Sequence, residues 1–399
     1  MNKRHIRIID LKEHTSKLCS LDDILSEEGN IIYKKYDKGV GKLSIEFPTL
    51  KTGNKWKLTA QGWVGHIPVT SELMIVINPK VRLSNLFKAL EYAYCLPKRS
   101  FYFFNNITYC ESLNDFYGCL AKYLVVLILE REKKGFYSTY ELKNEQLPYL
   151  TGKFDIRRTA KSPCKIMFDC EYQENTIDNL DNQILAWTLN CISRNPLCNE
   201  DVLQTVRMAY RRLASAVSIK HLYPCDCLRR LYNRLNQDYE QIHTICRFFI
   251  ENSGPSHKIG SEKMLPFLIE MPRLYQLFVT EWLRANLPKQ FHLNSSERIN
   301  TGKDGVRFEI DLVLYDAKRN VLCVLDIKYK RELRQDDIHQ ICTYAEVKQC
   351  NYGVLIYPET QTLNTCIGRV KIQSLTFSLE GNFEETGKKF INELLQNIS

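Results

Sequence analysis

The chain has 399 residues, 44% of them hydrophobic and 25% charged, which is typical of a globular protein long enough for two or three domains. No apolar run approaches the roughly 18 residues of a membrane-spanning helix, and the start, MNKRHIRIIDLKEH, lacks the apolar core of a signal peptide, so we expect a cytoplasmic protein with no membrane association. The net charge is +9, of which residues 1–255 contribute +8. That excess is too small to require or exclude nucleic acid.

Residues 1–110 are predicted to form a β-rich domain. The stretch NKWKLTAQGWVGHIPVTSELMIVINPK combines aromatic and β-branched residues with glycine-containing turns and ends in Asn-Pro. The following segment, LSNLFKALEYAYCL, predicts a helix that ends before Pro97.

Residues 111–255 are predicted to be a mainly helical middle region. A long helix is expected from an N-cap at Ser112 to Gly135, and three more helical stretches from about Asn179 to Asn252. Between them, 136–178 includes a basic segment and is compatible with either an extended stalk or a packed loop. The polar segment ENSGPSHKIGSEK is the clearest linker, so we place a domain boundary there.

Residues 256–399 predict helix, strand, strand, helix, strand, which is a small α/β domain. Pro272 suits the first turn of a helix that runs to about Asn286. A hairpin is expected over 307–330, a helix from about Asp336 to Gln349, and a strand at YGVLIYP.

Three charges interrupt the apolar hairpin: Asp311, Asp326 and Lys328. With a four-residue loop at 317–320, Asp316 pairs with Val321, and the ladder places Asp311 opposite Asp326 on one face, with Cβ atoms about 5 Å apart. Two carboxylates that close repel one another, and Mg²⁺ prefers such oxygens. Lys328, on the same face, could orient or help deprotonate an attacking water or balance the charge of a phosphate. These residues therefore fit a metal-dependent phosphodiester hydrolase.

A simpler interpretation also exists, because charged side chains protect the edges of sheets. A second Asp-x-Lys, at Asp10 to Lys12, follows an apolar run without an acidic strand before it, which shows how easily the tripeptide arises. On the next helix Gln340 and Tyr344 share one face, where an ordinary polar pair is equally compatible with the sequence.

The order of helix, acidic strand, D-x-K strand, helix and strand resembles the core of the PD-(D/E)xK nuclease superfamily. Ile310-Asp311 and Asp326-Ile327-Lys328 match its signature, and the Q-x-x-x-Y pair is common beside it. Over roughly residues 60–360 the chain also resembles the McrC family, the nuclease subunit of McrBC-type modification-dependent restriction systems. The blocks that carry this resemblance, in order before the hairpin, are GWVGHIPVTSELMIVINPKV, NLFKALEYAY, LTGKFDIRRTA and MPRLYQLFVTEWL.

The resemblance implies an N-terminal β-rich domain that docks on a partner, a helical middle region, and a C-terminal nuclease domain with a mixed sheet. It implies a Mg²⁺-dependent endonuclease, with Mn²⁺ as a substitute, that acts on double-stranded methylated DNA. The implied partner is a hexameric AAA+ GTPase of the McrB type, which recognises the methylation and whose hydrolysis this chain stimulates. Asp311, Asp326 and the Ile327 carbonyl would hold the metal. Lys328 would position the water and stabilise charge, and Gln340 would orient the site.

One residue departs from the family pattern. Members often carry an acid on the helix before the hairpin, as LFE where this chain has LYQ, so that Gln276 stands in its place. Glu281, on the 274/277/278 face of that helix, is a candidate replacement for the missing metal ligand, or a charge at the edge of the packed face.

Other motifs narrow the range of functions. DKGVGKLS differs from a P-loop because Tyr36 replaces the first glycine and Leu43 the final Ser or Thr, so we expect no nucleotide to bind this chain. The 15 cysteines occur without a secretion signal, which argues for reduced thiols. They include no C-x-x-C pair and the 8 histidines are dispersed, which argues against a zinc site. The basic segment with Lys153, Arg157 and Arg158 is either a solvated loop or a contact for the partner or DNA.

Two other functions remain open from the sequence. One is a catalytically inactive nuclease-fold regulator of an AAA+ NTPase, and the other is a stand-alone DNA repair or recombination nuclease.

Overall fold

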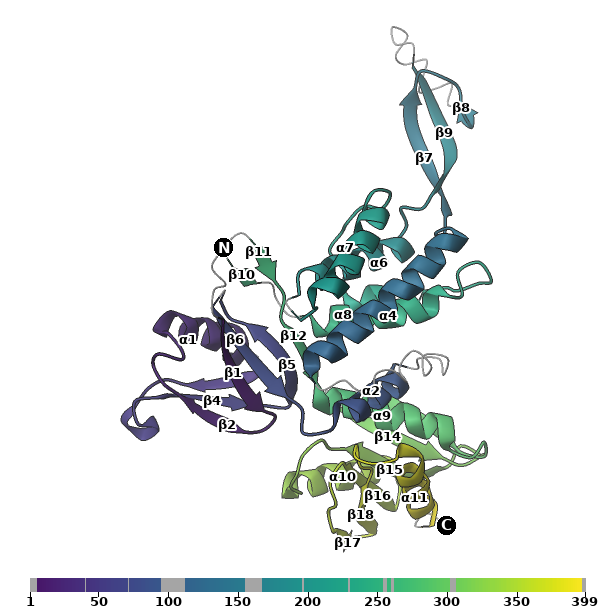
Figure 1. Ribbon diagram of the computed structural model, residues 1–399. Helices are drawn as coiled ribbons and strands as arrows, with labels where there is room; N and C mark the ends of the chain where they lie inside the picture. Colours follow the sequence, from purple (N-terminus) through teal and green to yellow (C-terminus); the bar gives the residue numbers. More distant parts are fainter. Residues whose placement is uncertain are drawn as a thin grey trace. The chain divides into compact units, whose positions relative to one another are not determined.

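The computed structural model describes residues 6–39, 41–70, 72–94, 112–154, 167–195, 197–228, 230–253, 257–259, 262–301 and 306–396 (Figure 1). The chain forms two compact units, one of residues 117–253 and the other of 1–116 together with 254–399. Residues 117–253 lie within the expected middle region, 111–255. The expected N-terminal and C-terminal domains, by contrast, are joined in the second. Within the described ranges, no helix combines the length and apolarity needed to cross a bilayer.

Strand β12 (Phe267–Glu270) explains this joining, because it belongs to the sheet of the N-terminal segment. It pairs antiparallel with β5 (Trp63–Pro68), with Phe267 beside His66 and Leu268 beside Gly65. A Cβ at Gly65 would lie 1.9 Å from the Phe267 carbonyl oxygen, so only glycine permits this approach. We call residues 6–94 with β12 the N-terminal lobe and residues 271–396 the C-terminal lobe.

The N-terminal lobe contains a four-stranded sheet in the order β1-β6-β5-β12 and a three-stranded sheet in the order β2-β4-β3. Alternate residues of β4 and β6 are buried, so both sheets contribute to one core that includes Trp56, Leu58 and Ile75. The elements of this lobe are β1 (Arg7–Lys12), β2 (Ser16–Cys19), α1 (Ser26–Ile32), η1 (Tyr33–Asp37), β3 (Leu43–Glu46), η2 (Leu50–Thr52), β4 (Trp56–Ala60), β5, β6 (Leu73–Asn78) and α2 (Leu83–Ala93).

Residues 117–253 form helices and a ribbon of strands. The helices begin where the sequence predicts: Ser112 caps α4 by accepting from the Asp115 amide (3.2 Å), and Asn179 caps α6 by accepting from the Asn182 amide (3.1 Å). The elements are α4 (Leu113–Lys134), β7 (Thr139–Leu147), β8 (Lys153–Phe154), β9 (Phe168–Thr176), α6 (Leu180–Ser193), α7 (Glu200–Ala214), η4 (Pro224–Cys227) and α8 (Tyr239–Asn252).

The ribbon is the structure of the described part of 136–178. Strands β7 and β9 pair from Thr139 beside Thr176 to Leu147 beside Phe168, and β8 adds to the far end of β9. In Figure 1 the ribbon extends away from the helices of its own unit, and Tyr140 is 71% exposed. This part of the chain is thus an extended stalk rather than a packed loop.

The C-terminal lobe is built on a mixed six-stranded sheet in the order β13-β14-β15-β16-β18-β17. Strands β15, β16 and β18 are parallel, and the other neighbours are antiparallel. Helix α10 packs on a core that includes Val313, Val324 and Leu355. Before β12 the chain forms β10 (His257–Ile259) and β11 (Glu262–Met264). The elements of the C-terminal lobe are α9 (Met271–Asn286), β13 (His292–Thr301), β14 (Val306–Tyr315), β15 (Val321–Ile327), α10 (Gln335–Val347), β16 (Tyr352–Tyr357), β17 (Asn364–Ile367), β18 (Val370–Thr376) and α11 (Phe383–Gln396).

The D-x-K hairpin has the predicted register along its strands but a different turn. Leu312 pairs with Leu325 and Val313 with Val324, so Asp311 and Asp326 are next in line opposite one another. The predicted pairing of Asp316 with Val321 is wrong, because Tyr315 takes that place and the register shifts by one residue. The Asp316 carboxylate instead accepts hydrogen bonds of 2.8 Å from two amides of the turn, a role that favours aspartate there.

Candidate metal centre

Asp311 on β14 and Asp326 on β15 form the centre of the candidate site. The two residues adjoin the paired positions Leu312 and Leu325 and so lie opposite one another on neighbouring strands, and Asp326 is only 2% exposed. Burial raises the pKa of Asp326, and the neighbouring charge of Asp311 raises it further; burial also raises the pKa of Asp311. Without a cation, the pair therefore tends to share a proton rather than carry two charges.

Asp311 is fixed at both carboxylate oxygens. Gln276 on α9 donates from Nε2 to Oδ1 over 2.8 Å, and the Ile327 amide donates to Oδ2 over 2.9 Å. A carboxylate oxygen accepts at more than one lone pair, so both oxygens can still bind a cation. This bond also places Ile327, whose carbonyl is expected to bind the cation, beside Asp311.

Lys328 lies on the same face of the hairpin as Asp311 and Asp326. Its Nζ lies 2.7 Å from Asp326 Oδ2 and donates to Gln340 Oε1 over 2.8 Å. Gln340 in turn donates from Nε2 to the Tyr344 hydroxyl over 2.7 Å, so the predicted Q-x-x-x-Y pair orients the lysine. Burial acts to lower the pKa of Lys328, but the carboxylates of Asp326 and Asp311 outweigh it and the pKa is raised. Lys328 is a cation at neutral pH, not a base.

The residues present fit a hard divalent cation. Asp326 Oδ2 is buried and has no hydrogen-bond partner among the described residues, despite its ion pair with Lys328. The Lys328 amine, 2.7 Å away, offsets part of its charge, and a divalent cation could bind at its remaining lone pair. Among those same residues no group of three or more His, Cys, Asp or Glu is placed to hold a metal. Two carboxylates suffice for Mg²⁺, which keeps several waters and takes oxygens from its substrate.

The structure brings Gln276, and not Glu281, to Asp311. Five positions along an α-helix turn the side chain by about 140°, and Glu281 forms an ion pair with Arg284 on its own helix. Of the basic segment, Lys153 is exposed on β8 in the unit of residues 117–253. Arg157 and Arg158 lie outside the described residues.

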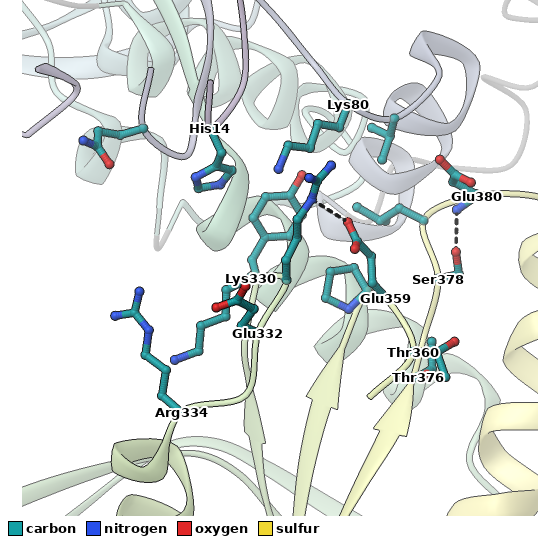
Figure 2. Close-up of a pocket in the computed structure, with 16 residues that line it drawn as sticks. His14, Lys80, Lys330, Glu332, Arg334, Glu359, Thr360, Thr376, Ser378 and Glu380 are labelled. Carbon is teal, nitrogen blue, oxygen red and sulfur yellow. Dashed lines mark hydrogen bonds and ion pairs between the residues drawn. The ribbon is translucent and has the colours of Figure 1, made fainter. Parts of the chain in front are cut away.

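A cavity of about 650 Å³ opens between the two lobes (Figure 2), and its lining does not include Asp311, Asp326 or Lys328. It lies at the carboxyl ends of the parallel strands β15, β16 and β18, where α/β proteins commonly bind ligands. Tyr329, directly after Lys328, is one of its walls. The charged residues around it are of both signs: Lys80, Lys330, Arg331, Glu332, Arg334, Glu359 and Glu380.

Comparison with known proteins identifies the family. The model of the McrBC 5-methylcytosine restriction system component matches residues 58–358 of this chain. The chain belongs to this McrBC family. This result confirms the resemblance to the McrC family. No curated protein sequence matches the chain closely enough to count as a relative.

Two solved structures are similar to this McrBC family member. The first is a chain of a half-complex from a tetradecameric assembly of Thermococcus gammatolerans McrB AAA+ hexamers with bound McrC. It matches with a TM-score of 0.62 at 16% identity, covering 97% of this chain and 100% of that one. The second is a chain of the Thermococcus gammatolerans McrBC complex, with a TM-score of 0.46 at 18% identity, covering 71% and 88%. At such identity the first match shows a shared fold.

Sequence reasoning missed two residues of this McrBC family member that adjoin the centre. The Tyr329 hydroxyl donates to Glu13 Oε2 over 3.2 Å, from one lobe to the other. Glu13 is fully buried, although its surroundings in DLKEH look like an exposed turn. The one signal for Tyr329 is its place directly after Lys328. Nothing in the sequence indicates Glu13, because its burial depends on a segment more than 300 residues away.

Proposed function

We propose that this McrBC family member is the nuclease subunit of a modification-dependent restriction system, which hydrolyses DNA phosphodiesters with Mg²⁺, or with Mn²⁺ as a substitute. One observation carries the proposal: two opposed carboxyl groups, with Asp326 buried and Asp311 partly buried, lie beside a lysine that is held as a cation. A sheet edge protected by charges would instead expose them, as β1 exposes Asp10 and Lys12 at the edge of its sheet.

Asp311, Asp326 and the Ile327 carbonyl would hold the cation. When bound, it would act as a Lewis acid toward the scissile phosphate and favour deprotonation of the attacking water. Lys328 would direct its positive charge at the phosphate as negative charge develops there, since its raised pKa keeps the amine protonated. Gln340 would hold the Lys328 amine in place, and Gln276 the Asp311 carboxylate.

The proposal includes a hexameric AAA+ GTPase of the McrB type that recognises methylated double-stranded DNA. The similar fold of a chain from an assembly of McrB AAA+ hexamers with bound McrC supports this partner. The lack of a P-loop motif in this sequence agrees with GTP hydrolysis taking place on the partner. The N-terminal lobe is proposed to dock on the partner, and Lys153, Arg157 and Arg158 to contact it or the DNA backbone.

The deciding experiment compares Asp326→Ala with Asp10→Ala in the presence of the partner, GTP, Mg²⁺ and methylated DNA. We expect Asp326→Ala to abolish cleavage while it still binds the partner and stimulates GTP hydrolysis. Asp10→Ala alters the exposed copy of the same tripeptide and should cleave as the wild type does. Undiminished cleavage by Asp326→Ala would falsify the catalytic assignment.

Gln276 favours a second candidate, an inactive nuclease-fold regulator of the GTPase, because it leaves the centre one acid short of the family pattern. Calorimetric titration with Mg²⁺ or Mn²⁺ separates the two. If the protein is a regulator without a metal site, the wild type and Asp311→Ala should give the same heat of titration, because no cation binds at Asp311. Cleavage without partner or nucleotide would instead favour a stand-alone nuclease.

A further inference from the structure

The end of β15 is the point at which the candidate metal centre meets the N-terminal lobe. The Lys328 amide donates to the Ile356 carbonyl over 2.9 Å, in the parallel ladder between β15 and β16. The next bond of that ladder would need an amide N–H at position 358, and Pro358 has none. Beyond Lys328 the sheet therefore no longer holds the chain, and side-chain contacts must fix it.

Tyr329 makes those contacts. Its hydroxyl donates to Glu13 Oε2 over 3.2 Å, and its ring lies 5.6 Å from the Tyr275 ring and 6.3 Å from the His14 ring, between centroids. Tyr275 is itself fixed, because it is buried and its hydroxyl donates to the Phe377 carbonyl over 2.8 Å. One side chain thus touches the N-terminal lobe, helix α9 and the end of β15.

The bond from Tyr329 to Glu13 satisfies a group that is costly to bury. Glu13 is 0% exposed, and its other oxygen, Oε1, has no hydrogen-bond partner among the described residues, although it lies 3.4 Å from His14 Nε2. Loss of the tyrosine hydroxyl would leave this carboxylate less satisfied still. Burial raises the pKa of Tyr329, and the charge of Glu13 adds to the effect, so the hydroxyl stays a donor.

The packing between the lobes is interrupted beside this bond. Figure 2 shows His14 and Lys80 of the N-terminal lobe across the cavity of about 650 Å³ from the loop with Lys330 and Glu332. Across a hollow of this size the side chains of the two lobes are not in direct contact. The hydrogen bond from Tyr329 to Glu13 lies at the wall of this cavity. It therefore links the two lobes where their side chains are otherwise apart.

Tyr329 and Tyr275 are each adjacent in sequence to a residue of the metal centre. Lys328 precedes Tyr329, and Gln276 follows Tyr275 and holds Asp311. We propose that Tyr329 is a positioning residue of the metal centre: bound by Glu13 and packed on Tyr275, it makes the N-terminal lobe a support for Lys328 and Gln276. This inference rests on the proposed nuclease function. It gives the docking lobe a direct structural effect on cleavage.

The first test uses the metal-free full chain. Tyr329→Phe removes the hydroxyl and keeps the ring. We expect faster hydrogen–deuterium exchange of the Lys328 amide in peptides that cover the end of β15. Asn85→Ala is the matched control, because Asn85 donates a buried bond of 2.9 Å from the N-terminal lobe to the Leu379 carbonyl, away from Lys328. Equal exchange at Lys328 in both variants would overturn the proposal and leave Tyr329 a general contact between lobes.

The second test measures cleavage with the partner, GTP and saturating Mg²⁺. Tyr329→Phe should lower kcat by roughly 10- to 100-fold, as a displacement of about 1 Å does, while KM for DNA should stay unchanged because the hydroxyl that is removed is bound to Glu13. Glu13→Gln retains an acceptor oxygen and should keep the activity that Glu13→Ala loses. An Asn85→Ala variant of similar melting temperature should cleave normally.

The outcomes separate this inference from the proposed function. If the wild type and Asp326→Ala cleave DNA at the same rate, the nuclease assignment itself fails. If only Asp326→Ala is inactive and Tyr329→Phe keeps the wild-type kcat, the positioning role of Tyr329 fails and the nuclease assignment stands.

Discussion

Gln276 Nε2 donates a hydrogen bond of 2.8 Å to Asp311 Oδ1, from the helix position at which the resemblance to the McrC family leads us to expect an acid. The Gln276 side-chain amide donates to the Asp311 carboxylate, whereas a glutamate at position 276 would repel it. Asp311 is therefore oriented before any cation binds, at the cost of one negative charge in the site.

Gln276→Glu should strengthen the binding of Mn²⁺ and destabilise the metal-free protein. A third carboxylate adds attraction for the cation, but it lies against Asp311 and replaces a donor with a like charge. Calorimetric titration and thermal unfolding without metal measure the two effects. Glu281→Gln is the control and should change neither, because Glu281 pairs with Arg284. Weaker binding by Gln276→Glu would place the cation away from this helix.

Metal affinity should rise with pH across the neutral range. Burial raises the pKa of Asp326 above its unfolded value of about 3.9. The pKa of Asp326 in the folded protein is about 7. At pH values between about 3.9 and about 7 the folded protein therefore binds more protons than the unfolded chain, so the stability contributed by Asp326 is lost as pH rises. A cation must displace the shared proton, which becomes easier as pH increases.

Titration with Mn²⁺ between pH 6 and 8, in two buffers of different ionisation enthalpy, counts the proton that is released. Asp326→Asn removes the titrating group and should abolish the pH dependence along with most of the affinity. Affinity that is constant over this range, with no proton release, would contradict the shared proton.

Gln340→Ala should slow cleavage by about 10- to 100-fold, the usual effect of removing a group that orients a metal-site residue. The loss arises because Lys328 Nζ no longer has the Gln340 acceptor at 2.8 Å and its direction is less defined. Single-turnover cleavage measures the effect. Gln335→Ala, at the exposed start of the same helix, is the control. Equal rates for the two variants would remove Gln340 from the site.

Gly353→Ala should destabilise the protein by about 1–3 kcal/mol through overpacking. A Cβ there would lie 2.8 Å from Ile341 Cγ1, so α10 would have to move away from β16. Gly118→Ala, in helix α4, meets nothing closer than 3.9 Å and should be neutral or stabilising. Denaturant unfolding compares the two. A stable Gly353→Ala would mean that α10 repacks without cost.

Local patterns in the sequence predict the elements around the site well. Helix α9 and the D-x-K strands follow from proline placement and apolar alternation, and the opposition of Asp311 to Asp326 follows from register. The prediction of a four-residue turn is wrong, because extending the strand register to Asp316 ignores the hydrogen bonds that its carboxylate accepts within the turn. Strand β13 was not predicted, since HLNSSERINT has no apolar face: it lies at the edge of its sheet and pairs on one side.

Long-range contacts explain the other differences. The pairing of β12 with β5 depends on Gly65 and Phe267, which are about 200 residues apart, so the linker pattern before β12 suggested a separate domain. The choice of Gln276 over Glu281 depends on the rotation of α9 against β14. The bond from Tyr329 to Glu13 has no local pattern at all.

The pairing of β12 with β5 also determines when the protein can finish folding during its synthesis. The ribosome releases the N-terminal strands first, and β5 then waits with an unpaired edge while more than 180 further residues are added. A chain that stops before β12 leaves that edge open to other strands. The lobe expected to dock on the GTPase is therefore completed only once the polypeptide that leads into the candidate metal centre has emerged.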